Sequence, residues 1–302
     1  MNVLALLTVL GWSLAAAGLT WYCLNIARQI TYVTLADGRR QERGLPLPFR
    51  LLLPLVHNLD PLVNRPALAS TCELCERRLV SAGFEGLLSG REFVALKFLF
   101  PTAFGVAWLL ALRLAARMLP MLADNVTFFS FAGLVALYLY PVLWLRQTIA
   151  ARHRSIQRAL PFVLDLLTLA VEAGLDFMTA LQRNTERRSL DALNEELIRM
   201  IREIQLGTPR RVALRNMSQR VDLADLRSVT YALIQADELG VSIGAILRIQ
   251  ADQLRQRRFD RAEKLANEAP VKMLAPLMLF IFPAVFIVLL GPILSGAVGN
   301  LF

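Results

Sequence analysis

Residues able to bind a metal or to act in catalysis are few and scattered along this chain. Cys72 and Cys75 form a single C-x-x-C pair, and the two histidines, His57 and His153, are distant from it in sequence. Because a closed zinc site needs four ligands, we interpret the pair as two small residues one helical turn apart. Cys23 lies in an apolar run. The cysteines therefore predict neither a metal site nor a disulfide scaffold.

The carboxylates of the C-terminal half are the other candidates for chemistry, as an acidic patch or a cation site. They are Asp165, Glu172, Asp176, Asp237 and Glu238. Scattered helix carboxylates more often cap helices or face solvent, and that is the interpretation we adopt. The chain contains no phosphate-binding loop, serine-hydrolase elbow or zinc-protease motif. We therefore expect a protein that is not an enzyme and that uses no cofactor.

The elements that hold these residues are strongly apolar. The chain has 302 residues, of which 56% are hydrophobic, and a mean hydropathy of +0.48. Four segments are long enough to cross a bilayer, which needs about 20 apolar residues: 2–27, 93–112, 126–145 and 273–293. Lys97 interrupts the second segment. We expect this lysine to reach the interface, and an ion-pathway lysine is the alternative.

The distribution of positive charge predicts the orientation of these spans. The stretch 146–272 holds 21 of the 33 Lys and Arg residues, and no charged residue follows Lys272. Cytoplasmic loops carry the excess of positive charge, so we expect both termini outside, in the periplasm, and both large polar stretches inside. The net charge of +9 is not interpreted as nucleic-acid binding, because no aromatic-rich basic face accompanies it.

The stretch 146–272 has helical periodicity throughout, and we expect six helices with glycines between them. A buried helix is predicted from Pro161 to Gly174, and Asp176 is predicted to cap the next helix. We also expect an i,i+4 pair between Glu195 and Arg199 on the polar face of a later helix. Asp222 or Asp225 is expected to cap the fifth helix. The fold class predicted is all-α: four transmembrane helices and a cytoplasmic six-helix bundle.

Several fragments in this region resemble the type II secretion system F domain. They are Leu160-Pro161-Phe162-Val163-Leu164-Asp165, Glu172-Ala173-Gly174-Leu175, Gln205-Leu206-Gly207-Thr208-Pro209-Arg210 and Gln235-Ala236-Asp237-Glu238-Leu239-Gly240. The stretch from Gln256 to Pro283 is similar to the tight-adherence (Tad, Flp pilus) branch of that family. Within this branch the chain looks more like the TadC type of platform protein, with the TadB type second. Residues 28–92 resemble a shortened first copy of the domain.

The apolar segments, the charge distribution and this resemblance together predict the organisation of the whole chain. We expect transmembrane helix 1 at 1–27, a cytoplasmic helical segment at 28–92, and helices 2 and 3 with a short periplasmic loop at 93–145. The F-type domain occupies 146–272, and transmembrane helix 4 with a periplasmic C-terminus occupies 273–302. The implied localisation is the bacterial inner membrane.

The resemblance also implies a function and its partners. The implied function is a non-catalytic platform for assembling a Tad (Flp, type IVc) pilus. The platform couples a cytoplasmic hexameric ATPase (TadA-like) to pilin insertion. A TadB-like sister platform protein, pilin subunits and the lipid bilayer are the other expected partners, in a homo- or hetero-oligomer. A transporter or channel subunit and a membrane-anchored signalling scaffold are the alternatives.

Two sets of residues are the candidates for these contacts. The turns expected to face the ATPase contain Arg187, Arg188, Gly207, Arg210, Arg211, Asp237, Glu238 and Gly240. For any one of them, an ordinary solvated turn residue is the competing interpretation. The basic run expected to face lipid headgroups is Arg255, Arg257, Arg258, Arg261 and Lys264.

Overall fold

The computed structural model of the chain describes residues 32–34, 40–42, 45–56, 66–118 and 125–299. The described part is almost entirely helical, as the sequence predicts. The first expected span, 1–27, and His57 lie outside the described residues. The structure adds one short antiparallel hairpin in the segment expected to be helical, in which β1 (Tyr32–Thr34) pairs with β2 (Arg40–Glu42). The aromatic and β-branched residues of β1 favour an extended strand.

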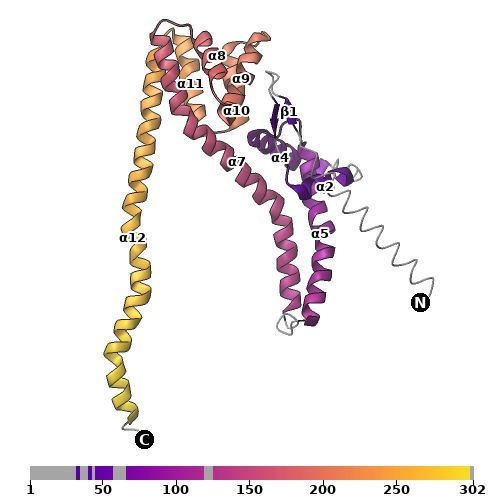
Figure 1. Cartoon of the computed structure of the whole chain (residues 1–302), viewed down its shortest axis with the longest axis vertical. Coiled ribbons are helices and arrows are strands. Elements are labelled where there is room, and N and C mark those ends of the chain that lie inside the picture. Colours follow the sequence, from indigo (N-terminus) through magenta and orange to yellow (C-terminus); the bar gives the residue numbers. More distant parts are fainter. Residues whose placement is uncertain (1–31, 35–39, 43–44, 57–65, 119–124, 300–302) are drawn as a thin grey trace, which may run out of the picture.

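The helices fall into an N-terminal and a C-terminal group. The first group comprises α2 (Leu47–Val56), η2 (Pro66–Leu68), α4 (Ala69–Ala82) and α5 (Gly90–Met118). The second comprises α7 (Val126–Glu172), α8 (Phe177–Arg187), α9 (Ala192–Gln205), α10 (Arg210–Val221), α11 (Ala224–Leu239) and α12 (Ile243–Gly299). In Figure 1 helices α8–α11 gather at one end of the molecule, and α7 and α12 descend from it separately.

Two hydrophobic cores correspond to these groups. The larger one lies inside the C-terminal bundle around Ile156, Leu193 and Leu247, each with no exposed surface. The smaller one surrounds Phe49 and Leu96 at the base of α5, and it includes Leu145 of α7. Helix α7 therefore belongs to both cores and joins the two groups.

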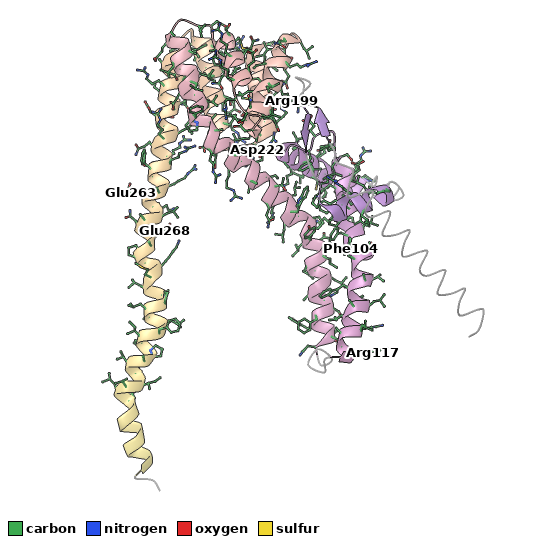
Figure 2. The ribbon with its side chains drawn as sticks, in the orientation of Figure 1. Phe104, Arg117, Arg199, Asp222, Glu263 and Glu268 are labelled. Carbon is green, nitrogen blue, oxygen red and sulfur yellow. The ribbon has the colours of Figure 1, made fainter. Side chains whose placement is uncertain are left out.

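Helices α7 and α12 are both continuous from the bundle into their apolar segments. The prediction of a separate helix starting at Pro161 is wrong, because Pro161 lies inside the 47-residue α7. In the same way α12 runs for 57 residues and passes through Pro270 without ending. Figure 2 places Glu263 and Glu268 on the part of α12 that extends beyond the bundle.

Three helices are long and apolar enough to cross a membrane, within the described residues: Gly90–Arg117, Val126–Glu172 and Ile243–Leu290. The α5–α7 pair is held by close approach at two glycines. A Cβ atom at Gly133 would lie 2.0 Å from Nε1 of Trp108, and one at Gly105 would lie 2.7 Å from Cδ2 of Leu134. In contrast, no residue of the most apolar stretch of α12 is buried against the rest of the described chain. The spans thus comprise a packed pair and a separate helix.

Candidate partner-binding surfaces

Two turns meet at the end of the bundle where α9 and α11 finish, and we call this end the tip. Gly207 (φ +98°) and Gly240 (φ +66°) adopt the left-handed conformation that ends a helix. After each glycine the chain turns back, and the amides of Thr208 and Val241 donate to the carbonyls of Glu203 and Ala236. These helix ends agree with the glycine signals in the sequence.

Arginines and carboxylates from the two turns pair across the tip. Nη2 of Arg210 lies 3.1 Å from Oδ1 of Asp237, and Nη1 of Arg211 lies 3.4 Å from Oε1 of Glu238. The guanidinium of Arg210 also stacks over the ring of Phe177, 4.7 Å from its centroid. Beside these pairs the side chains of Leu206 and Leu239 are 79% and 77% exposed. The tip therefore combines ion pairs with apolar side chains that nothing in the described chain covers.

The eight candidate turn residues divide between the two ends of the bundle. Six of them lie at the tip: Gly207, Arg210, Arg211, Asp237, Glu238 and Gly240. Arg187 and Arg188 lie at the opposite end, because α8 runs away from the tip and ends at Arg187. There Arg188 pairs with Asp191, whose Oδ1 accepts a hydrogen bond of 2.8 Å from the Asn194 amide and caps α9.

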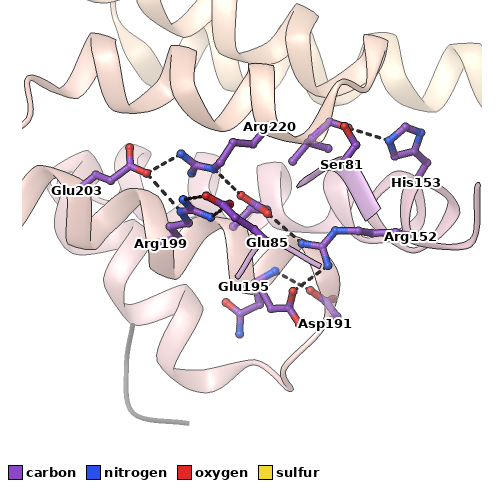
Figure 3. Close-up of polar contacts among 12 residues, drawn as sticks. Ser81, Glu85, Arg152, His153, Asp191, Glu195, Arg199, Glu203 and Arg220 are labelled. Carbon is purple, nitrogen blue, oxygen red and sulfur yellow. Dashed lines mark hydrogen bonds and ion pairs between the residues drawn. The ribbon is translucent and has the colours of Figure 1, made fainter. Parts of the chain in front are cut away.

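Near this opposite end lies a buried network of charges that sequence reasoning missed (Figure 3). Arg152 of α7 reaches Glu195 and Glu196 of α9, with N–O distances of 2.9 Å to each. Arg220 of α10 lies 3.2 Å from Glu196 and also pairs with Glu203 at 2.5 Å. The network ties three helices together. The only sequence signal for it was an excess of Glu and Arg on predicted helices.

A second link connects this network to the N-terminal group. Both terminal nitrogens of Arg199 donate to the carboxylate of Glu85, in the turn between α4 and α5. Arg199 also lies 3.6 Å from Glu203. The hydrogen bond from Arg199 lowers the pKa of Glu85. The expected i,i+4 pair of Glu195 with Arg199 is wrong: among the described residues, the i,i+4 partner of Arg199 is Glu203, and Glu195 pairs with Arg152 of α7.

Most of the basic run on α12 contacts the bundle. Arg255 pairs with Asp165 of α7, and Arg257 lies 3.1 Å from Asp225 of α11. Arg261 lies 3.5 Å from the other oxygen of Asp225. Asp225 is therefore a buried acceptor within α11, and Asp222 (φ 51°) follows the last residue of α10. The prediction that Asp222 or Asp225 caps α11 is wrong, because Leu223 occupies the N-cap position.

Arg258 compensates for the hydrogen bond that Pro161 removes from α7. A proline has no N–H, so Pro161 leaves the carbonyl of Gln157 without its usual helical donor. Nη2 of Arg258 donates to that carbonyl, and it donates at 3.1 Å to the carbonyl of Arg158. A side chain from a distant helix thus replaces the missing hydrogen bond, which local sequence does not reveal.

The remaining candidates for chemistry are separated from one another. Asp176 accepts from the Met178 amide and caps α8 as predicted, and Glu172 pairs with Arg248. Cys72 and Cys75 are free thiols, and burial raises the pKa of Cys75. No group of three metal-binding side chains occurs among the described residues. These residues act as caps and partners in the described structure.

His153 and Lys97 have separate local contacts. Nε2 of His153 lies 2.8 Å from the carbonyl oxygen of Val221. Nζ of Lys97, in α5, lies 4.6 Å from the centroid of the Tyr138 ring on α7. This cation–π contact gives the lysine a favourable position beside the second helix of the packed pair.

Comparison with known protein families finds a match, which includes the bundle and part of α12. Residues 163–291 match the model of the family described as type II secretion system (T2SS), protein F. This stretch is similar to the F domain of that family. It covers less than half of the chain, from the last three turns of α7 to the apolar part of α12. No curated protein and no solved structure matches the chain.

The match indicates a general class of function. Proteins with this domain are generally non-catalytic membrane platforms of secretion or pilus systems, and they work with an ATPase and other platform proteins. Together with three apolar helices, it indicates a protein of the inner membrane.

Proposed function

We propose that this chain is a non-catalytic inner-membrane platform protein for assembly of a Tad (Flp, type IVc) pilus. In this role it couples a TadA-like hexameric ATPase to the insertion of pilin subunits into the fibre. A TadB-like sister protein completes the platform, and this chain takes the TadC-like position. Both termini lie in the periplasm, and the F domain lies in the cytoplasm.

The observation that carries this proposal is the continuity of α7 and α12. Each helix leaves the F domain and enters an apolar segment without an interruption. An α-helix rises about 1.5 Å per residue, so α12 extends over roughly 85 Å. A displacement of the bundle is therefore transferred directly to the membrane segments. Such coupling is what a platform between a motor and pilins requires.

The tip is the surface that we assign to the ATPase. It lies at the end of the bundle away from the descending parts of α7 and α12 (Figure 1). Its exposed Leu206 and Leu239 provide apolar contact area, and the adjacent Arg211 and Glu238 provide polar contacts at the rim. This composition is typical of a protein interface, which has an apolar centre and a polar edge.

The N-terminal group supports the proposal that 28–92 is a shortened first copy of the F domain. Helix α4 ends at Gly83 (φ +83°), and α5 then continues into an apolar segment. Helix α11 ends at Gly240 (φ +66°), and α12 does the same. The order of helix, left-handed glycine and long membrane helix thus occurs twice.

Binding of the cognate ATPase to the full chain in nanodiscs tests the tip assignment. We expect the double substitution Leu206→Glu, Leu239→Glu to weaken ATPase binding at least tenfold and to abolish pili, because it places charge in an apolar contact. The matched control is Tyr231→Glu, which alters an exposed side chain on the side of α11. Undiminished ATPase binding by the double variant would refute the assignment.

A further inference from the structure

An open groove runs along α7 on the F domain, at the end opposite the tip. It has a volume of about 540 Å³. Its floor is formed by side chains of α7, and its wall by the turn between α8 and α9. The lining residues are Ala151, Arg154, Ser155, Arg158, Ala159, Phe162, Arg188 and Asp191.

The floor of this groove has the shape that a helix requires. Ala151, Ser155 and Ala159 recur every four residues and so form a line of small side chains along α7. Small residues at this spacing allow a second helix to approach closely. Phe162 follows one turn later and is 58% exposed. From Ala151 to Phe162 the floor extends over about 16 Å, which is about three helical turns.

The charges around the groove are unbalanced. Three guanidinium groups face it, against the single carboxylate of Asp191, which already pairs with Arg188 and caps α9. Among the described residues, neither Arg154 nor Arg158 has a carboxylate within ion-pair distance. Nη1 of Arg188 is buried and has no hydrogen-bond partner in the described part of the chain. Within the described chain, Arg154 donates only to the carbonyl of Ala150 on its own helix, so the groove holds more positive charge than its one carboxylate balances.

We propose that this groove binds an amphipathic helix of another polypeptide that carries carboxylates along one edge. Arg154 and Arg158 are four residues apart, so they match carboxylates at i and i+4 on a helix that lies alongside α7. The apolar face of that helix covers the small residues and Phe162. Because the groove is at the opposite end from the tip, this proposal does not depend on the ATPase assignment.

A lipid headgroup fits the groove less well. The expected membrane segment of α7 ends at Leu145, and the headgroup layer is about 5–8 Å thick on each side. Phe162 lies about 25 Å further along α7, so a headgroup would reach only the Arg154 end. An occupant that fills the whole groove must be elongated and partly apolar.

Site-specific crosslinking in cells that make the natural partners tests this proposal. A photo-crosslinking amino acid is placed at Ser155 of the full chain, and the crosslinked peptide is identified by mass spectrometry. We expect a peptide from another protein with carboxylates at helical spacing. The substitutions Arg154→Glu and Arg158→Glu should reduce the crosslink at least tenfold. Reversing two of the identified carboxylates to lysine should restore it.

The double variant Arg202→Glu, Arg215→Glu is the matched control, because both arginines are exposed on other faces of the same domain. It should leave the crosslink unchanged. A crosslink to phospholipid, to this chain itself or to a segment without carboxylates would overturn the proposal. So would an absent crosslink from a chain that still assembles pili, or a crosslink that the Arg154→Glu, Arg158→Glu variant retains.

Discussion

The two ends of the F domain use the same kinds of residue in different surroundings. At the tip, Arg211 and Glu238 face each other with 54% and 48% of their side-chain surface exposed. Near the other end, Arg152 and Glu195 are only 8% and 4% exposed. Exposed pairs contribute little to stability because water and salt screen them. Buried charges cost much more when a partner is removed.

This difference separates structural charges from those available to a partner. The buried network holds α7 against α9 and α10, so its arginines have no freedom to meet another protein. The pairs at the tip are weak, so their arginines can exchange a carboxylate of this chain for a carboxylate of a binding partner. The two ends can therefore be distinguished by substitutions that remove one charge from each.

Arg152→Met should have the largest effect. It leaves the buried carboxylate of Glu195 without its arginine, and breaking such a pair costs about 3–5 kcal/mol. We expect that decrease in the free energy of opening of α9, measured by hydrogen exchange on the full chain in nanodiscs. Adding Glu195→Gln removes the carboxylate that faced Arg152 and should recover part of the loss. If Arg152→Met lowers the free energy of opening of α9 by less than about 1 kcal/mol, the buried ion pairs are not what stabilises the bundle.

Asp191→Ala should have the next largest effect. It removes the cap of α9 and the partner of Arg188 together. Loss of an N-cap costs about 0.5–2 kcal/mol, so we expect about 1–2 kcal/mol from the same exchange measurement. The matched comparison is Asp191→Asn, which retains an acceptor for the Asn194 amide and should lose less. Equal losses in the two variants would contradict a capping role.

Local sequence predicted the helix ends of the tip but not the network that stabilises the other end. Gly207, Gly240 and Asp176 act within one turn of their own position, so their types and places indicate a helix boundary directly. Glu195 and Arg199 also suggested a local pair. Glu195 instead pairs with Arg152, and both terminal nitrogens of Arg199 bind Glu85; these partners are 43 and 114 residues away in sequence. Such contacts depend on how whole helices pack, which an i,i+4 pattern does not contain.

Pro161 illustrates the same limit for the backbone. A proline in a helical pattern indicates a boundary because one hydrogen bond is lost. Here Arg258 supplies the donor from α12. A helix about 100 residues later in the chain thus satisfies the carbonyl that Pro161 leaves without a donor. The pairing of arginines at the tip with Asp237 and Glu238 was likewise not predicted, although the residues themselves were singled out.

The ion pair of Arg199 with Glu85 is more exposed than the buried network and slightly less exposed than the Arg211–Glu238 pair, since both of its side chains are nearly half exposed. Arg199 lowers the pKa of Glu85, so the pair contributes stability above the ordinary Glu pKa of about 4.3. That contribution is lost as the pH falls through the lowered pKa. Because solvent screens the pair, we expect Glu85→Gln to weaken the contact between the groups by under about 1 kcal/mol.

Exchange protection of the turn between α4 and α5 measures this contact. At neutral pH the protection should be lower in Glu85→Gln than in the original chain. The difference should disappear in acid, where Glu85 is protonated in both the closed and the open state. A difference that persists unchanged below the lowered pKa would show that charge is not its cause.

Asp237→Asn should have the smallest effect on stability and distinguishes the two ends most directly. Asp237 faces Arg210 and Arg211 at the tip, where it is 31% exposed. Removing its charge should change the opening free energy of α11 by no more than about 0.5 kcal/mol, because solvent screens this partly exposed pair. If the tip binds the ATPase, the same substitution should nevertheless alter ATPase affinity, because Arg210 and Arg211 lose a competing carboxylate. A large loss of stability would instead place Asp237 with the buried network, and the contrast between the two ends would not hold.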